Sequence, residues 1–144
     1  MKEDVSFTAY TADNKDACMT LFDENCPQYF APNERGDYQN FLEQLPSGYE
    51  VCLTSDEVIA VFGLINNSLN WILISPRATG QGLGSSIMNR VIQLARSNHL
   101  TTIEIAASHM SKGFFAKHGA KAIAEELNGW GPGMHRVDMR LDLA

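Results

Sequence analysis

The sequence predicts an α/β domain in which seven strands and four helices follow one another in the order β-α-α-β-β-β-α-β-α-β-β. Short runs rich in β-branched and aromatic residues, separated by turn residues, indicate the strands. Stretches in which apolar residues recur every three or four positions indicate the helices. The chain has 144 residues, 44% hydrophobic and 19% charged, so residues 1–144 are expected to form a single domain.

The first third of the chain is expected to hold one strand and two helices. The strand is predicted over Val5–Thr11, and Asp13 or Asn14 is expected to cap the helix that follows. After a break at Cys26-Pro27, a second helix is predicted to end before Pro46. It carries apolar residues at helical spacing: Tyr38, Phe41, Leu42 and Leu45.

Three β-rich runs follow, and short polar turns between them indicate an antiparallel meander. The runs are Tyr49–Thr54, Val58–Ile65 and Leu69–Ser75. The next segment has apolar residues at i, i+4, i+8 and i+11 from Leu83, which predicts a helix ending near Asn98.

The last third of the chain is expected to hold three strands and one short helix. The helix is predicted to be capped by Ser108 or Ser111 and closed by Gly119. The last two strands are expected to pair across a loop at residues 128–133. The predicted strands are Thr101–Ala106, Lys121–Leu127 and Met134–Leu143.

Three glycines on alternate positions, Gly80, Gly82 and Gly84, stand where a predicted strand passes into a predicted helix. The first N–H groups of a helix have no partner within it and carry the positive end of its dipole, so they can hold a phosphate. Glycine allows close approach and positive φ at such a site. A P-loop would need a Lys after the glycines, and the dinucleotide fingerprint has the spacing G-x-G-x-x-G. The loop therefore predicts a different phosphate-bearing cofactor.

This segment resembles the pyrophosphate loop of the GNAT acetyltransferase superfamily, in which a strand, a Pro and an Arg/Gln-x-x-Gly-x-Gly/Ala motif lead into a helix. Two registers fit this motif. Arg77–Gly82 matches it literally, whereas Thr79–Gly84 places the final Gly directly ahead of the helix, as the family does. We favour the second register, which leaves Arg77 as a nearby phosphate partner. The resemblance implies that acetyl-CoA is bound by Ile74, Ser75, Arg77, Thr79, Gly80, Gln81, Gly82, Leu83, Gly84 and Ser85.

A second stretch, residues 108–120, is similar to the family pattern N-x-x-A-x-x-F-Y-E-K-x-G-F. Three of its residues fall in register: Phe114, Lys117 and Gly119. Ser108 and Ser111 replace the Asn and Ala of the pattern, and Phe115 replaces the Tyr that often serves as general acid. The resemblance adds Ser108, Ser111 and Phe115 to the expected cofactor site, but it leaves the general acid open.

The order of elements along the whole chain is also similar to that of the GNAT fold. The resemblance implies a mixed, mostly antiparallel sheet of about seven strands flanked by about four helices, with strands four and five splayed around the cofactor. It implies direct transfer of an acetyl group from acetyl-CoA to a primary amine, with CoA as product. We expect the acceptor to be a small metabolite or an amino-acid-like molecule. The alternatives are a protein N-terminus or lysine as acceptor, or a non-catalytic acyl-CoA-binding sensor, which Phe115 would fit.

Three residues are candidates for the chemistry of transfer. The family usually supplies an oxyanion donor from its fourth strand, which by position is the backbone N–H of Ile74. Glu104 points away from its apolar neighbours and fits either a general base or a solvated strand face. His135 lies beside the glycine-rich loop of Trp130, and its ordinary pKa near ~6.5 suits proton transfer. We favour His135 as the acid–base group, although a surface histidine would fit its position equally.

The family builds its acceptor site from the first helix pair and the late loop, which overhang the acetyl end of the cofactor. Here the segment Tyr29–Glu34 combines aromatic rings with a carboxylate, which suits a cation. The same rings would also serve to pack two helices together. The candidate acceptor-binding residues are Tyr29, Phe30, Glu34, Asn70, Trp130 and His135.

Composition narrows the partners and the compartment. The net charge of −6 disfavours nucleic acid and favours a cationic acceptor. No apolar run approaches the ~20 residues of a membrane span, and the N-terminus lacks the apolar region of a signal peptide. The three cysteines form no C-x-x-C pair, which indicates a reducing cytoplasm and no metal site. We expect a cytoplasmic monomer or homodimer that binds neither nucleic acid nor membrane.

Overall fold

Seven strands form one sheet in the order β1-β2-β3-β4-β5-β7-β6 in a computed structural model that describes residues 5–78 and 82–143. Neighbouring strands are antiparallel except β4 and β5, which are parallel. This confirms the predicted mixed, mostly antiparallel sheet. The strands are β1 (Ser6–Ala9), β2 (Tyr49–Thr54), β3 (Glu57–Ile65), β4 (Ser68–Ile74), β5 (Thr102–Ser108), β6 (Lys121–Gly131) and β7 (Met134–Asp142).

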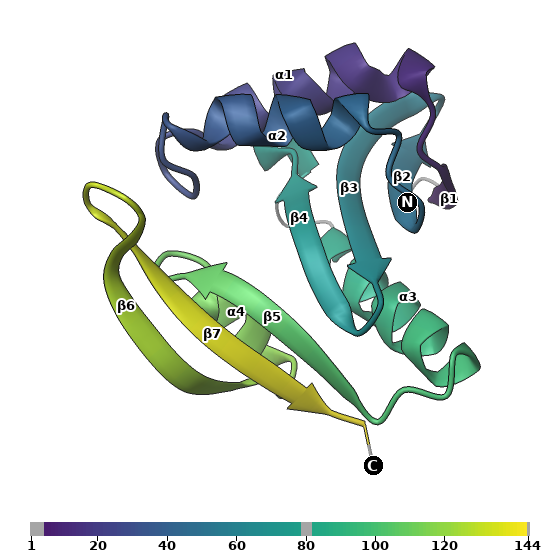
Figure 1. Cartoon of the computed structure of the whole chain (residues 1–144). Helices are drawn as coiled ribbons and strands as arrows, with labels where there is room; N and C mark the ends of the chain where they lie inside the picture. Colours follow the sequence, from purple (N-terminus) through teal and green to yellow (C-terminus); the bar gives the residue numbers. More distant parts are fainter. Residues whose placement is uncertain (1–4, 79–81, 144) are drawn as a thin grey trace.

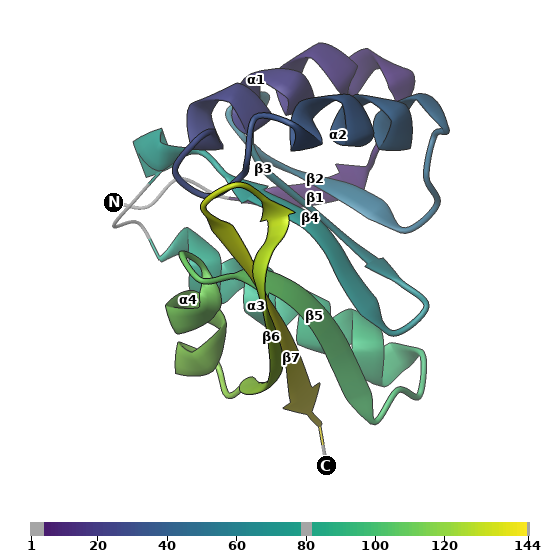
Figure 2. The ribbon, with the colours of Figure 1, turned by 60° about the vertical axis from the view of Figure 1, so that its left-hand side comes forward.

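Among the described residues, four α-helices and two short 3₁₀ helices cover the sheet. Figures 1 and 2 show α1 and α2 together on one face of β2–β4, with α3 on the opposite side of the sheet. The short α4 follows β5 and packs near β6. The helices are η1 (Ala12–Asn14), α1 (Lys15–Asn25), α2 (Glu34–Glu43), η2 (Pro76–Ala78), α3 (Leu83–Ser97) and α4 (Lys112–Lys117).

Two apolar clusters fill the space between these layers. One lies under α1 and α2 and is dominated by aromatic side chains, among them Phe22, Tyr38 and Tyr49. The other lies under α3 and includes Ile87 and Val91 of the predicted apolar stripe. Burial of both faces of the sheet removes apolar surface from water, which is the main favourable term in folding. The two clusters thus hold the sheet rigidly in place.

The sheet opens between its two parallel strands. Only Ser68 and Leu69 of β4 pair with β5, opposite Glu104 and Ile105, among the described residues. Beyond these pairs the strands diverge, and Figure 1 shows β4 and β5 close at one end and far apart at the other. The splay expected between strands four and five is therefore present.

A bulge in β4 lies beside this opening. Val61 pairs with Leu73 and Gly63 pairs with Asn70, so two residues of β4 stand opposite one residue of β3. Trp71, within the bulge, has a φ of 44°, in the left-handed region that a tryptophan rarely adopts. Such strain persists only where the surroundings hold it.

Two buried tyrosines hold the bulge. The hydroxyl of Tyr49 donates to the carbonyl oxygen of Trp71 at 2.6 Å and lies 2.9 Å from the hydroxyl of Tyr38. Both tyrosine side chains are buried. Because Tyr49 has one proton and a carbonyl can only accept, Tyr38 donates to Tyr49.

Two predicted boundaries differ from the structure. Leu45 lies outside α2, which ends at Glu43. The helical conformation is unfavourable for a residue that precedes a proline, as Leu45 precedes Pro46. Leu45 has a φ of 50° and is exposed. The predicted loop at residues 128–133 is shorter than expected. β6 continues to Gly131 through a register shift, and Asn128 in that irregular stretch has a φ of 54°.

Candidate active site

A cavity of about 900 Å³ occupies the opening between β4 and β5. It extends from the first turn of α3 and the helix α4 to the connection between α1 and α2. We call these two parts the helix end and the loop end. The helix end is lined by Ser75, Pro76, Ala78, Gly82, Leu83, Gly84, Ser85, Ser108, Met110, Ser111, Phe114, Phe115, Lys117 and His118. The loop end is lined by Asn25, Gln28, Tyr29, Phe30, Glu34, Asn70, Trp71 and Trp130.

The N-terminus of α3 opens onto the helix end. Gly82 is the N-cap residue, and its φ of 73° is one that glycine adopts without strain. The first N–H groups of this 15-residue helix have no partner within the helix, and with the helix dipole they favour an anion. Gly84 permits close packing, because a Cβ there would lie 2.5 Å from the ring of Phe114. The helix end is thus suited to a phosphate.

The turn between β5 and α4 forms another wall of the helix end. The Ser108 hydroxyl accepts from the backbone N–H groups of Met110 and Ser111, and the Ser111 hydroxyl accepts from that of Ser108. These hydroxyls shape the turn. Lys117 adds a cation to the wall, and burial together with Lys117 lowers the pKa of His118. Phe115, 2% exposed, contributes no polar atom.

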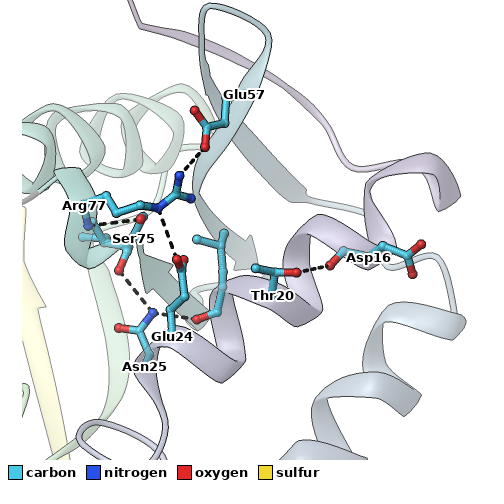
Figure 3. A network of polar contacts seen from close by, with 9 residues as sticks. Asp16, Thr20, Glu24, Asn25, Glu57, Ser75 and Arg77 are labelled. Carbon is cyan, nitrogen blue, oxygen red and sulfur yellow. Dashed lines mark hydrogen bonds and ion pairs between the residues drawn. The ribbon is translucent and has the colours of Figure 1, made fainter.

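The last residue of β4 turns its backbone toward the opening. The N–H of Ser75 donates to the carbonyl of Ile59 on β3 at 2.8 Å. Since backbone groups alternate sides along a strand, the N–H and carbonyl of Ile74 face the diverging strand β5. Asn25, 6% exposed, donates to that carbonyl at 3.2 Å and to the carbonyl of Leu21 at 2.7 Å (Figure 3). The Ile74 N–H therefore lies at the cavity wall in a fixed direction.

A buried carboxylate lies at the loop end. Glu34 is the first residue of α2 and is 4% exposed. Its Oε2 accepts from the backbone N–H of Ala31 at 2.8 Å. Burial raises the pKa of Glu34 to about 7, and Asp37 adds to this, although the hydrogen bond from Ala31 opposes it. Glu34 thus changes its charge near neutral pH.

Aromatic side chains surround this carboxylate. Phe30 and Trp71 stack with ring centroids 6.0 Å apart and planes 20° apart. The indole N–H of Trp130 donates to the carbonyl of Ala107 at 2.9 Å, which fixes the ring against β5. Asn33 donates to the carbonyl of Trp130 at 2.9 Å and so ties the α1–α2 connection to the end of β6.

Most of the residues predicted for the site line this one cavity. The structure brings together fourteen of them: Tyr29, Phe30, Glu34, Asn70, Ile74, Ser75, Gly82, Leu83, Gly84, Ser85, Ser108, Ser111, Phe115 and Trp130. Thr79, Gly80 and Gln81 lie outside the described residues. The favoured register of the glycine motif, Thr79–Gly84, consequently remains a prediction. Gly84 itself is the second residue of α3, whereas that register placed it directly ahead of the helix.

Arg77 is held away from the cavity, contrary to its predicted place near a phosphate. Its guanidinium forms ion pairs with Glu24 and Glu57, as Figure 3 shows. Arg77 is not among the residues that line the cavity. The Arg77 side chain, which was predicted to contact the cofactor, is thus paired with two carboxylates from distant parts of the chain.

Neither acid–base candidate reaches the cavity. Glu104 pairs with Arg140 of β7 at 3.0 Å, which is the solvated strand face left open as the alternative. The ring of His135 accepts at Nδ1 from the backbone N–H of Asn128 at 2.9 Å, and it packs against His109 with centroids 4.6 Å apart. His135 therefore supports the β6–β7 hairpin, and of the ionisable residues that were predicted for the site, Tyr29 and Glu34 line the described cavity.

Several lining residues were not among the predicted site residues, among them Asn25 and Trp71. Asn25 is a buried polar residue at the C-terminus of α1, and its only local signal is an amide on an otherwise apolar helix face. Trp71 packs against the aromatic core cluster, and its bulge also shapes the wall of the cavity. A bulge depends on the pairing of two strands, so the sequence of one strand carries little sign of it.

Within residues 5–78 and 82–143, no group of three or more His, Cys, Asp or Glu side chains is placed to hold a metal ion. The helices of that same region are all too short or too polar to cross a bilayer.

The chain belongs to the GNAT acetyltransferase family. The model of the acetyltransferase (GNAT) family matches residues 18–120, which include most of α1, the helices α2–α4, the strands β2–β5 and the glycine-rich loop. A search of curated protein sequences gave no match. The family assignment confirms the resemblance found in the sequence. It also supports an acyltransferase as the class of enzyme to which the protein belongs.

Solved structures share the fold across the whole chain. An acetyltransferase of the GNAT family from Staphylococcus aureus Mu50 has 14% identity, a TM-score of 0.75, and coverage of 98% of this chain and 100% of that one. The ribosomal-protein-S18-alanine N-acetyltransferase from Escherichia coli has 11% identity, a TM-score of 0.77, and coverage of 98% and 95%. YncA from Salmonella typhimurium, solved with its cofactor acetyl-CoA, has 14% identity, a TM-score of 0.69, and coverage of 98% and 95%.

Proposed function

We propose that this protein is an N-acetyltransferase that moves the acetyl group of acetyl-CoA to the primary amine of a small metabolite or amino-acid-like molecule. One observation carries the proposal: the same cavity joins the N-terminus of α3 to the buried carboxylate of Glu34. The positive end of the α3 dipole suits the phosphates of the donor, and the carboxylate of Glu34 suits a cationic acceptor. Both lie in the same cavity.

The residues of the helix end fit CoA. The N–H groups at Gly82–Ser85 suit a diphosphate, and Lys117 supplies a further cation. The rings of Phe114 and Phe115 offer an apolar wall for the pantetheine arm. When bound, acetyl-CoA supplies a thioester carbon to which the amine nitrogen forms its bond while the carbon–sulfur bond breaks.

The proposed roles of the remaining residues follow from their atoms. The backbone N–H of Ile74 would donate to the carbonyl oxygen as negative charge develops on it. Glu34 would accept a proton from the incoming ammonium, and its pKa of about 7 suits this at neutral pH. Phe115 has no proton to donate, so protonation of the released thiolate falls to water. A thiol with a pKa of about 8.5 is a good enough leaving group for this.

Thiol release from acetyl-CoA tests the proposal. The panel should hold small amines, amino acids, an alanine-initiated peptide, a lysine peptide and a reaction with no acceptor. Release that depends on a small amine supports the proposed function, and a preference for either peptide would assign the protein acceptor instead. Tight CoA binding without thiol release in the presence of any acceptor would overturn the proposed enzyme activity and favour the non-catalytic sensor.

A pair of glycine variants tests the cofactor site independently of turnover. CoA should raise the melting temperature of the wild type, because it binds only the folded state. Gly82→Asp should abolish this shift by placing a carboxylate at the N-terminus of α3. Gly133→Asp is the matched control: its φ is also positive, at 78°, but it lies in the β6–β7 turn and does not line the cavity. Equal shifts in both variants would mean that CoA binds elsewhere.

A further inference from the structure

The loop end of the cavity is acidic. Among the described lining residues, the basic side chains are Lys117 and His118, and both belong to the helix end. Two arginines near the loop end in the chain pair with carboxylates and do not line the cavity. Arg35 pairs with Asp23 at 2.8 Å. Arg136 lies over the ring of Trp130, 4.9 Å from the ring centroid, and pairs with Asp138 at 2.8 Å. Among the described residues that line the loop end, Glu34 therefore offers a carboxylate to a ligand, and none of them offers a cation.

The carboxylate is positioned for a ligand. The hydrogen bond from Ala31 uses Oε2 of Glu34, and Glu34 lines the cavity without an ion pair to any other described residue. Burying a charge without a partner is costly, and a bound ammonium would remove that cost. Burial raises the pKa of Glu34 for the same reason.

The walls around Glu34 are apolar and flat. Tyr29, Phe30, Trp71 and Trp130 all line the loop end. Trp130 and Trp71 are held by hydrogen bonds to their ring or backbone, so their positions do not depend on a ligand. Fixed aromatic faces bind a planar apolar group and also attract a cation.

Resting on the proposed function, we propose that the acceptor is a primary monoamine with an aromatic or other apolar body and without a carboxylate, its ammonium bound by Glu34. An amino acid would bring its own carboxylate next to Glu34, with no cation of the described loop end to receive it. The structure thus favours arylalkylamines over the amino-acid-like acceptors that the proposed function also admits.

Three compounds that share one body test this inference: 2-phenylethylamine, L-phenylalanine and L-phenylalaninol. Phenylalaninol carries a neutral group in place of the carboxylate, so it separates charge from size. Their dissociation constants are measured by calorimetry on the protein saturated with CoA, and kcat/KM is measured with acetyl-CoA. Phenylethylamine and phenylalaninol should each bind about 100-fold more tightly than phenylalanine and have a kcat/KM higher by a similar factor. The reason is that two like charges placed together are strongly unfavourable.

Two variants of α2 assign the preference to one residue. Glu34→Gln should weaken binding of phenylethylamine at least about tenfold and bring its affinity close to that of phenylalanine. Glu43→Gln removes the same charge from an exposed position at the other end of the same helix and should change neither affinity. The CoA-dependent rise in melting temperature, unchanged in both variants, would show that they are folded.

The outcomes separate the two proposals. Equal or tighter binding of phenylalanine, no binding of any of the three compounds, or an unchanged preference in Glu34→Gln would overturn the inference about the acceptor. Absence of turnover with every acceptor would overturn the proposed function, and the inference would then be decided by the calorimetric affinities alone.

Discussion

Removal of the Tyr49 hydroxyl should destabilise the protein more than any other tyrosine-to-phenylalanine change in this cluster. Tyr49→Phe takes the donor from the Trp71 carbonyl, 2.6 Å away, and the acceptor from the Tyr38 hydroxyl, 2.9 Å away. Each polar group left buried without a partner costs about 1–3 kcal/mol. We therefore expect the free energy of unfolding to fall by about 2–4 kcal/mol.

The neighbouring tyrosines provide a graded series. Tyr38→Phe leaves the bond from Tyr49 to Trp71 in place and should cost only about 1 kcal/mol. Tyr10 donates to the carbonyl of Leu42 at 3.4 Å, a long bond, so Tyr10→Phe should cost less than about 1 kcal/mol. The Tyr38→Phe/Tyr49→Phe double variant should cost less than the sum of the two single changes, because no orphaned Tyr38 hydroxyl remains.

Urea denaturation measures these differences through the midpoint, provided that the slope with denaturant stays constant. The reasoning would be refuted if Tyr49→Phe cost no more than Tyr10→Phe. Additive costs in the double variant would show that the Tyr38 and Tyr49 hydroxyls are not energetically coupled. Either result would mean that the bulge at Trp71 is held by packing alone.

Four further changes have expected outcomes. Gly84→Ala should lower the free energy of unfolding by about 1–3 kcal/mol in urea, because its Cβ would meet the Phe114 ring, and Phe114→Leu should restore part of this. Arg77→Ala should leave the dissociation constant of CoA within about twofold at low and high salt, since its ion pairs lie outside the cavity; a large loss would return Arg77 to the phosphate site. His135→Ala should keep kcat within about threefold in the thiol-release assay, and a 100-fold fall would reinstate it as the acid–base group. The urea midpoint of the wild type should fall as pH rises from 4.5 to about 7, since the folded state keeps the Glu34 proton that the unfolded state has lost; Glu34→Gln should flatten this slope, and an unchanged slope would contradict the raised pKa.

Local signals in the sequence predicted the part of the cavity that depends on local structure. The position of α3 follows from a period of 3.6 residues, and the turn at Gly82 follows from a residue type that accepts positive φ. Glu34 was placed with the acceptor because it follows aromatic residues in the chain. Its burial, which raises its pKa, required the packing of α2 against the sheet.

Three described residues that were predicted for the site do not line the cavity, and their positions depend on contacts with distant segments. Arg77 finds Glu24 and Glu57, 53 and 20 positions away, and no pattern near Arg77 indicates them. Glu104 was correctly expected to point away from Ile103 and Ile105, but which face of β5 borders the cavity depends on where β4 leaves the sheet. His135 lies near Trp130 in the chain, yet the irregular end of β6 directs the two rings to different partners.

The hydrogen bond from Asn33 to Trp130 joins residues 97 positions apart, whereas β4, α3, β5 and α4 form one continuous stretch of the chain. The helix end can therefore assemble from neighbouring elements, while the loop end needs both an early and a late segment. Contacts of long sequence separation form slowly because a large loop must close first. On a ribosome, the loop end would be completed only after the last strand has emerged, so the site proposed for CoA would form before the site proposed for the amine.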